Sequence, residues 1–291
     1  MVIKVKNKTQ QYLSRQSMLT NDYEIFHYYD RTLDKVNLHH HDFYECYFFI
    51  AGDVTYIVEG KIYSLLPGDI VLVNTKELHQ LVINNREISY ERIVLWLDKS
   101  FVGNLSTETT DLEKCFEDSE RVNVIRSDLE TQQILKSILN KLLNLDSYKG
   151  IGIDLLYRAY IIELLIALNN ILFHRNEKFT LEIEKSSLVD EIIHYINTHL
   201  DEEIKLDDLS DQFFISKFHL LRIFKKQSGT TIHKFIVQKK LILAKELILT
   251  GMAINQVYEH CGFGDYSNFF RAFKNEYGIT PKQYFELLRR D

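Results

Sequence analysis

Four side chains in the first third of the chain belong to types that bind metals or polar ligands. His39, His41 and Glu45 follow one another at spacings of two and four residues, and His79 lies further along. On one β-strand alternate residues share a face, so the first three are expected to point the same way. Imidazoles and a carboxylate facing one cavity suit zinc, iron, manganese or nickel. The alternative is that they hydrogen-bond to a sugar's hydroxyls or to one another.

A second chemical pattern occurs twice near the C-terminus. Arg-x-Phe-Lys is found at 222–225 and again at 271–274, each time with a serine before it and a glycine after it. A shorter amphipathic helix is predicted before each copy, over Leu206–Phe213 and Ile254–His260, and a long helix, Ile232–Leu249, joins them. Two short helices with the second carrying exposed basic residues are typical of helix-turn-helix units that bind DNA.

The local physics of each unit agrees with this interpretation. Ser216 and Asp265 are residue types that cap helix N-termini. The phenylalanine of each repeat is expected to face the core, with the arginine two residues before it on the opposite side, free to reach a groove. Gly262 suits a left-handed helix end. Thr280, Pro281 and Gln283 supply an N-cap, a first-turn proline and a capping-box partner for a last helix.

These residues resemble the C-terminal signature of the AraC/XylS family of bacterial transcription regulators, and the resemblance spans roughly Leu188–Arg290. Two departures stand out: Ser210 and Tyr258 occupy positions where the family usually has a small alanine, and Tyr258 needs extra room. The signature residues are Ile254, Val257, Cys261, Gly262, Phe263, Asp265, Ser267, Phe269, Arg271, Phe273, Lys274, Gly278, Thr280, Pro281 and Tyr284.

The resemblance implies two recognition helices in adjacent major-groove segments, about one turn of DNA (~34 Å) apart. By motif position, the candidates for base contacts are Phe218, Leu221 and Arg222 in the first helix and Tyr266, Ser267, Asn268 and Arg271 in the second. Ser216, Lys217, Lys225, Lys226 and Lys274 complete the predicted DNA-binding set, the lysines as phosphate contacts. The alternatives are solvated charges for the lysines and surface salt bridges for the arginines.

The histidine-rich segment resembles the first motif of the cupin superfamily, which runs His-x-His, three residues, Glu, six residues and Gly. Gly52 completes that spacing after Glu45. In the second motif Gly68 and His79 keep the register, whereas Asn74 and Lys76 replace the usual Pro and Gly. The resemblance covers about residues 30–100. It implies that this half is an effector-binding domain, with His39, His41, Glu45 and His79 in the pocket.

The elements around these residues predict an α+β chain. Short apolar stretches separated by turn residues indicate an antiparallel sandwich or barrel over 1–127, which the cupin resemblance implies is a cupin-like β-barrel or jelly roll. Residues 128–173 have helical spacing and form the predicted dimerisation segment, although packing on the β domain is an equal and compatible alternative. Residues 174–186 are the predicted linker, and 187–291 the all-α domain with two helix-turn-helix units. The predicted dimer contacts are Leu135, Ile138, Leu139, Leu142 and Leu143.

Charge first argues against a DNA-binding protein and then supports one. The 291 residues carry 35 Lys and Arg and 41 Asp and Glu, a net charge of −6. Residues 212–291 alone hold 13 Lys and Arg against 6 Asp and Glu, a net charge of +7. The acidic excess therefore belongs to the first part of the chain, and the basic part contains both predicted recognition helices.

Three separated cysteines without a CxxC pair favour neither a disulfide framework nor a zinc ribbon. The N-terminus lacks an apolar signal-peptide core, and polar residues interrupt the apolar stretch Leu155–Phe173, so a cytoplasmic protein without a membrane contact is expected.

The combined prediction is a homodimeric regulator, an activator that contacts RNA polymerase, controlled by a small molecule, a sugar. It is not predicted to be an enzyme. The alternative is a metal-binding cupin, either a metal sensor or a metal-dependent sugar-modifying enzyme.

Overall fold

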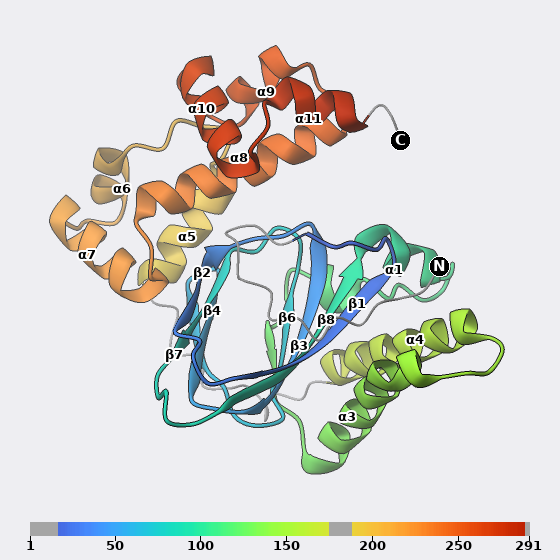
Figure 1. Ribbon diagram of the computed structural model, residues 1–291. Helices are drawn as coiled ribbons and strands as arrows, with labels where there is room; N and C mark the ends of the chain where they lie inside the picture. The colour runs from blue at the N-terminus through green and yellow to red at the C-terminus, as the bar shows by residue number, and fades with distance from the viewer. Residues whose placement is uncertain (1–16, 175–187, 289–291) are drawn as a thin grey trace. The chain divides into compact units, whose positions relative to one another are not determined.

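The computed structural model describes residues 17–174 and 188–288, which form two compact units (Figure 1). The first unit holds the β-strands and helices α1–α4, and the second holds α5–α11. This confirms the α+β fold class. The predicted linker, 174–186, lies outside the described residues from position 175 onward, and the proposed domain boundaries remain predictions.

The first unit is built from two antiparallel sheets. One has the strand order β1-β8-β3-β6-β9 and the other the order β2-β7-β4-β5. The strands are β1 (Tyr23–Asp30), β2 (Lys35–His39), β3 (Phe43–Ala51), β4 (Val54–Val58), β5 (Lys61–Ser64), β6 (Ile70–Val73), β7 (His79–Ile83), β8 (Tyr90–Asp98) and β9 (Val124–Ile125).

The strands β3, β6 and β8 of the five-stranded sheet are buried on both faces, which explains why they are apolar almost throughout. In β3, Tyr44, Cys46 and Phe48 pack with the helices, whereas Phe43 and Tyr47 point into the space between the sheets. This alternation is the period of two that a strand imposes on its side chains. The inward row of β3 also contains Glu45, so the strand delivers a carboxylate into the interior of the barrel.

Helices cover the outer face of that sheet (Figure 1). The longest, α4, buries Tyr157, Ile161, Leu164, Leu165 and Leu168 in a core shared with α3 and the strands. By length and composition α4 could also cross a membrane, contrary to the expectation that this stretch falls short, but one such helix is weak evidence. The helices are α1 (Lys99–Leu105), α2 (Lys114–Glu117), α3 (Leu129–Leu143) and α4 (Ile153–Phe173).

The second unit is entirely helical. A long central helix, α8 (Ile232–Leu249), joins a first group of helices to a second. The first group is α5 (Leu188–Thr198), α6 (Leu206–Gln212) and α7 (Lys217–Ser228), and the second is α9 (Ile254–His260), α10 (Tyr266–Tyr277) and α11 (Pro281–Leu288). The predicted pair of helix-turn-helix units is therefore present, as α6–α7 and α9–α10.

Candidate functional site

The two helix-turn-helix modules begin and end their second helices with the predicted caps. The Ser216 hydroxyl accepts a hydrogen bond from the His219 amide at 3.3 Å, and an Asp265 carboxylate oxygen accepts one from the Asn268 amide at 2.8 Å. Both helices end at a left-handed glycine, at 229 and 278. These caps fix where α7 and α10 start, and hence which side chains lie on their first exposed turn.

The core of each module holds the helix by its aromatic face. Phe224 is fully buried and contacts Phe235 of α8 edge to face, with ring centroids 5.5 Å apart. Phe273 is also fully buried, between Phe269 and Tyr277. Because these residues fix one face of each helix inward, the opposite face is directed to solvent.

All twelve predicted DNA-contacting side chains are exposed. Phe218 exposes 76% of its surface, an unusual value for an aromatic side chain in a soluble protein. Their contact with DNA remains a prediction. The set comprises Ser216, Lys217, Phe218, Leu221, Arg222, Lys225, Lys226, Tyr266, Ser267, Asn268, Arg271 and Lys274.

The two arginines differ in how they are held. Arg271 donates to the Asn268 side-chain oxygen at 2.6 Å and to the Ser267 carbonyl at 3.3 Å. Asn268 in turn donates to the second carboxylate oxygen of Asp265. Arg222 lies 3.5 Å from His219 Nδ1, a longer contact. The α10 surface is therefore ordered by a chain of polar contacts that starts at its N-cap.

The histidine cluster forms, but not on a single strand. The expectation that residues 39–45 alternate along one strand is wrong, because β2 ends at His39 in one sheet and β3 begins at Phe43 in the other. The chain turns between them and brings His41 against His79 of β7, with ring centroids 4.8 Å apart. The ligand atoms of His41, Glu45 and His79 lie within 4.8 Å of one another. His39 packs on His79, with ring centroids 4.1 Å apart, outside that three-residue group.

Glu45 is the polar centre of the barrel interior. One of its oxygens accepts a hydrogen bond from the Tyr56 hydroxyl and the other from Trp96 Nε1, both at 2.9 Å. Burial by itself raises the pKa of Glu45, but its contact with His41 holds that pKa below its usual range. The carboxylate is therefore ionised and already oriented.

Burial has the opposite effect on two of the imidazoles. It lowers the pKa of His39 to about 4 and that of His79 well below its usual value, so both are neutral at pH 7. The neutral ring is the form that binds metals. His41 Nε2 and His79 Nε2 are buried without a hydrogen-bond partner among the described residues, and the former lies 3.7 Å from Glu45. Two unsatisfied ring nitrogens beside an ionised carboxylate are compatible with a bound cation.

A buried cation lies further along the inward row of β8. Arg92 is 1% exposed, forms an ion pair with Asp30, and lies over the rings of Tyr28 and Tyr90 at 4.6 and 4.2 Å from their centroids. Trp96 follows four residues later on the same face. The barrel interior thus has an acidic, histidine-rich part and a basic part, with aromatic side chains between them.

Known protein families match both the N-terminal and the C-terminal part of the chain. Residues 23–165 match the family described as AraC-like ligand binding domain, and residues 209–287 match the helix-turn-helix domain family. The chain belongs to the AraC/XylS family.

Three relatives illustrate the similarity. The probable transcriptional regulator LumQ of Photobacterium leiognathi is 37% identical over 94 residues, 32% of this chain and 38% of LumQ. The xylose operon regulatory protein of Escherichia coli K12 is 38% identical over 93 residues, 32% of this chain and 24% of the relative. These matches therefore span well under half of either relative. The HTH-type transcriptional activator RhaS of Salmonella paratyphi A is 23% identical over 255 residues, 84% of this chain and 85% of RhaS.

The predicted dimer contacts of this AraC/XylS chain lie in its interior. Leu135, Ile138, Leu139 and Leu142 are at most 1% exposed, and Leu143 is half-buried against the same core. They pack against α4 and the sheet. Of the two interpretations of this segment, packing on the β domain is therefore the one that applies to these five residues. Helix α4 also has exposed apolar side chains, since Leu155, Ile166 and Phe173 expose 68%, 42% and 77% of their surfaces.

Sequence reasoning missed side chains in both the AraC-like domain and the DNA-binding domain. Tyr56, Trp96 and Arg92 are far apart in the sequence and carry no motif, so only the paired strands bring them to the interior. Phe214, in the α6–α7 turn, has a φ of 53° and is 95% exposed. Its counterpart in the second module is Gly262, which also has a positive φ. Aligning the two modules would therefore have predicted a left-handed conformation at Phe214 from the sequence.

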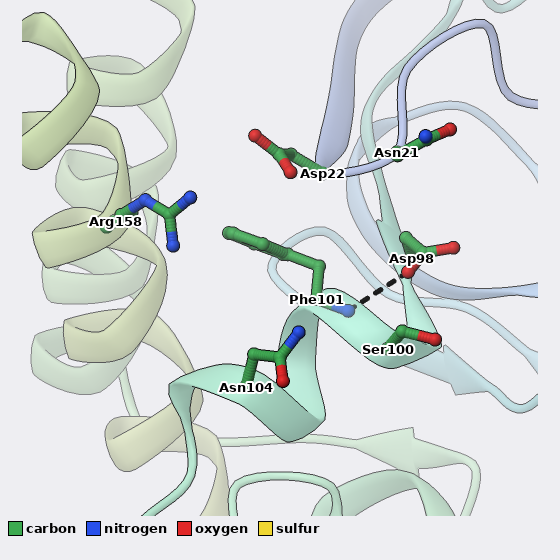
Figure 2. A pocket seen from close by; sticks show the side chains of 7 residues that line it. All are labelled: Asn21, Asp22, Asp98, Ser100, Phe101, Asn104 and Arg158. Atoms are coloured by element: carbon green, nitrogen blue, oxygen red, sulfur yellow. Dashed lines mark hydrogen bonds between the residues drawn. The ribbon is translucent and has the colours of Figure 1, made fainter.

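A surface pocket of about 380 Å³ lies elsewhere on the first unit, between the start of β1, helix α1 and helix α4. Figure 2 shows Arg158 of α4 directed toward Asp22 above the ring of Phe101. Arg158 lies 5.3 Å from the centroid of Phe101, and Asp22 accepts a hydrogen bond from Tyr157 at 2.7 Å. These contacts tie α4 to the first strand at this edge.

Proposed function

We propose that this protein is a transcription regulator that binds two adjacent major-groove segments of DNA and responds to a small molecule bound inside its barrel. The observation that carries the proposal is the pair of helix-turn-helix modules, whose predicted contact residues are all exposed on a basic part of the chain. Arginine and asparagine are residues that read guanine and adenine edges in the major groove.

DNA binding is tested by a gel shift of the full chain on the intergenic DNA beside its gene, with random duplex of equal length as the control. Specific retention that persists against excess random DNA supports the proposal. The proposal is contradicted if, for every intergenic segment, excess random DNA competes away the bound protein as well as the intergenic DNA itself does.

The proposed effector is a sugar, because aromatic rings and hydrogen-bonding groups converge in the barrel interior. Tyr56 and Trp96 donate hydrogen bonds to an oriented carboxylate, Glu45, and aromatic rings are side chains that suit the apolar faces of sugars. The relative named for the xylose operon supports this class. The effector must bind the two DNA-presenting arrangements with different affinity for regulation to follow.

Effector binding is tested by thermal shift and calorimetry with D-xylose and a panel of other pentoses and hexoses. We expect one sugar to stabilise the protein and the Glu45→Gln variant to lose that response. The exposed variant Glu163→Gln, on α4, is the matched control. Stabilisation of Glu45→Gln equal to that of the natural protein would exclude the barrel interior as the site.

A metal in the same interior is the second candidate, supported by the two buried imidazole nitrogens without partners. His41, Glu45 and His79 would hold it, and the ion would supply a Lewis-acidic contact for a ligand's oxygen atoms. Metal analysis of the purified protein and of His79→Ala tests it. A metal content that His79→Ala leaves unchanged, or its absence after growth with added zinc, iron, manganese and nickel, rules this candidate out.

We further propose a cytoplasmic homodimer that activates transcription by contacting RNA polymerase. The activator relative RhaS supports the sign of regulation. The exposed apolar side chains of α4 now replace the buried leucines of α3 as the proposed dimer contacts. Ile166→Glu is expected to yield monomers in sedimentation experiments. Ile134→Glu, an equally apolar and exposed position on α3, is expected to leave the dimer intact.

A further inference from the structure

Lys240 is a buried cation at the centre of the DNA-binding unit. It lies on the long helix α8 and is 4% exposed. Its ammonium donates to the Glu202 carbonyl at 2.6 Å and to the Gly262 carbonyl at 2.5 Å. Glu202 belongs to the turn that leads into α6, and Gly262 to the turn between α9 and α10. One side chain therefore bonds both to the backbone of the segment that leads into the first helix-turn-helix unit and to the backbone inside the second.

The two turns also touch directly. A Cβ atom at Gly262 would lie 2.0 Å from the Glu202 carbonyl oxygen and 2.7 Å from Lys240 Nζ. Only a glycine allows this approach, and its φ of 60° is a conformation that other residues rarely adopt. Two carbonyl oxygens meeting here without a cation would repel each other, and the ammonium that donates to both removes that repulsion.

Both acceptors in this contact are backbone carbonyls, whose positions are fixed by the fold. The Lys240 ammonium also lies 5.8 Å from the centroid of Phe263, the residue after Gly262, where the ring face attracts a cation. Burial lowers the pKa of Lys240, because removing an ammonium from water is unfavourable. Hydrogen bonds to well-placed acceptors offset that desolvation penalty. Charge-assisted hydrogen bonds of this kind are the stronger ones in proteins.

We propose that Lys240 is a positioning residue that locks the two helix-turn-helix modules to each other and thereby fixes the spacing at which α7 and α10 meet DNA. It contacts no base or phosphate in this role. Helix α8 alone connects the modules covalently, whereas Lys240 bonds across them. The inference rests on the proposed DNA-binding function, since it concerns how that function depends on half-site spacing.

The test compares two duplexes in anisotropy titrations of the full chain. The first is a sequence selected from random DNA by the natural protein, and the second has two base pairs inserted between its half-sites. The insertion rotates one half-site by about 70° relative to the other. The natural protein is expected to lose affinity on the order of 100-fold, because only one module can then engage. For Lys240→Met the same ratio is expected to be at least tenfold smaller.

The ratio separates positioning from stability, because a variant that folds poorly loses active protein equally on both duplexes. Lys240→Arg is expected to restore most of the spacing discrimination, and Lys234→Met, an exposed lysine on the same helix, is expected to match the natural protein. If Lys240→Met keeps the full ratio, the inference is wrong. If the natural protein selects no sequence at all, the proposed function fails instead.

A measurement without DNA tests the same lock. Spin labels at Lys226→Cys and Asn275→Cys, both exposed positions, report the distance between the ends of α7 and α10, since all three natural cysteines are buried. The distance distribution is expected to broaden in Lys240→Met and to stay narrow in Lys234→Met. An equally narrow distribution in Lys240→Met would contradict the inference even if DNA binding weakened.

Discussion

Helices α7 and α10 carry an arginine at the same position of the same motif, but they surround it with different chemistry. The first exposed turn of α7 presents Lys217 and Phe218, with Leu221 beyond them, whereas that of α10 presents Tyr266, Ser267 and Asn268. Arg271 is held by two hydrogen bonds, whereas Arg222 has one long contact at 3.5 Å. The second module thus holds its arginine in an ordered polar network, whereas the first places two exposed apolar side chains, Phe218 and Leu221, beside a more loosely held arginine.

The same helix-turn-helix backbone can therefore serve two kinds of DNA recognition. A polar network suits hydrogen bonding to base edges, and its order reduces the conformational entropy lost on binding. Apolar side chains can contact only thymine methyl groups or the sugar–phosphate surface. We therefore expect most of the sequence discrimination in the second half-site. The turns differ in the same sense, since the second depends on Gly262 and the first accommodates Phe214.

The largest effect is expected at the second turn. Gly262→Ala places a methyl group against the Glu202 carbonyl and forces a left-handed alanine, at a cost of about 3 kcal/mol in the free energy of unfolding. Gly278→Ala is the matched control, because its φ of 73° is similar but nothing lies within 4 Å of the added carbon. That variant should lose only about 1 kcal/mol. Equal losses in urea unfolding would mean that the close contact with Glu202 has no energetic role.

The next effect concerns the two arginines. Arg271→Ala is expected to weaken binding to the selected operator by about 1–3 kcal/mol, with little change on random duplex. Arg222→Ala is expected to fall at the lower end of that range, because its side chain must be ordered on binding. Anisotropy titrations at fixed salt measure both. A larger loss for Arg222→Ala, or equal losses on random DNA, would reverse the proposed division between the modules.

The polar network can be measured as a coupling. In a double-mutant cycle, Asn268→Ala and Arg271→Ala should be non-additive in operator binding by about 1 kcal/mol, because Asn268 holds the guanidinium. The same cycle with His219→Ala and Arg222→Ala should be close to additive. Similar coupling energies in both modules would show that the difference in order disappears in the complex.

The DNA-binding unit could be read from the sequence because its signals are local. Caps, left-handed glycines and the Arg-x-Phe-Lys repeats each depend on residues within one or two helical turns, and Ser216, Asp265 and Pro281 start the helices where predicted. Even so, no sequence pattern points to Lys240. Its partners are backbone carbonyls 38 and 22 residues away, which no motif encodes.

The sequence predicts a β-barrel as a fold class, but it does not predict which side chains meet inside that barrel. His39 and Glu45 lie on different sheets, and Tyr56, His79 and Trp96 reach the same interior from three further strands. Which strands pair, and in which register, depends on contacts distant in sequence. The dimer contacts fail for a related reason: periodicity shows that Leu135 and Leu139 form an apolar face, but not that α4 and the sheet cover it.

The smallest effect is expected at the first turn, and it is a gain in stability. Phe214 holds a left-handed conformation that costs a non-glycine residue about 1–2 kcal/mol, and its 95% exposed ring gains little packing in return. Phe214→Gly is expected to raise the free energy of unfolding by roughly 0.5–1 kcal/mol after allowing for the more flexible unfolded chain. Phe218→Ala, which removes a similarly exposed ring from an ordinary helical position, should give no such gain. If Phe214→Gly also weakens operator binding while leaving random DNA unaffected, the ring belongs to the apolar readout surface of the first module. If the substitution destabilises the protein, Phe214 makes contacts that offset its backbone strain. The α6–α7 turn would then be stabilised by its own residue, as the α9–α10 turn is by Gly262.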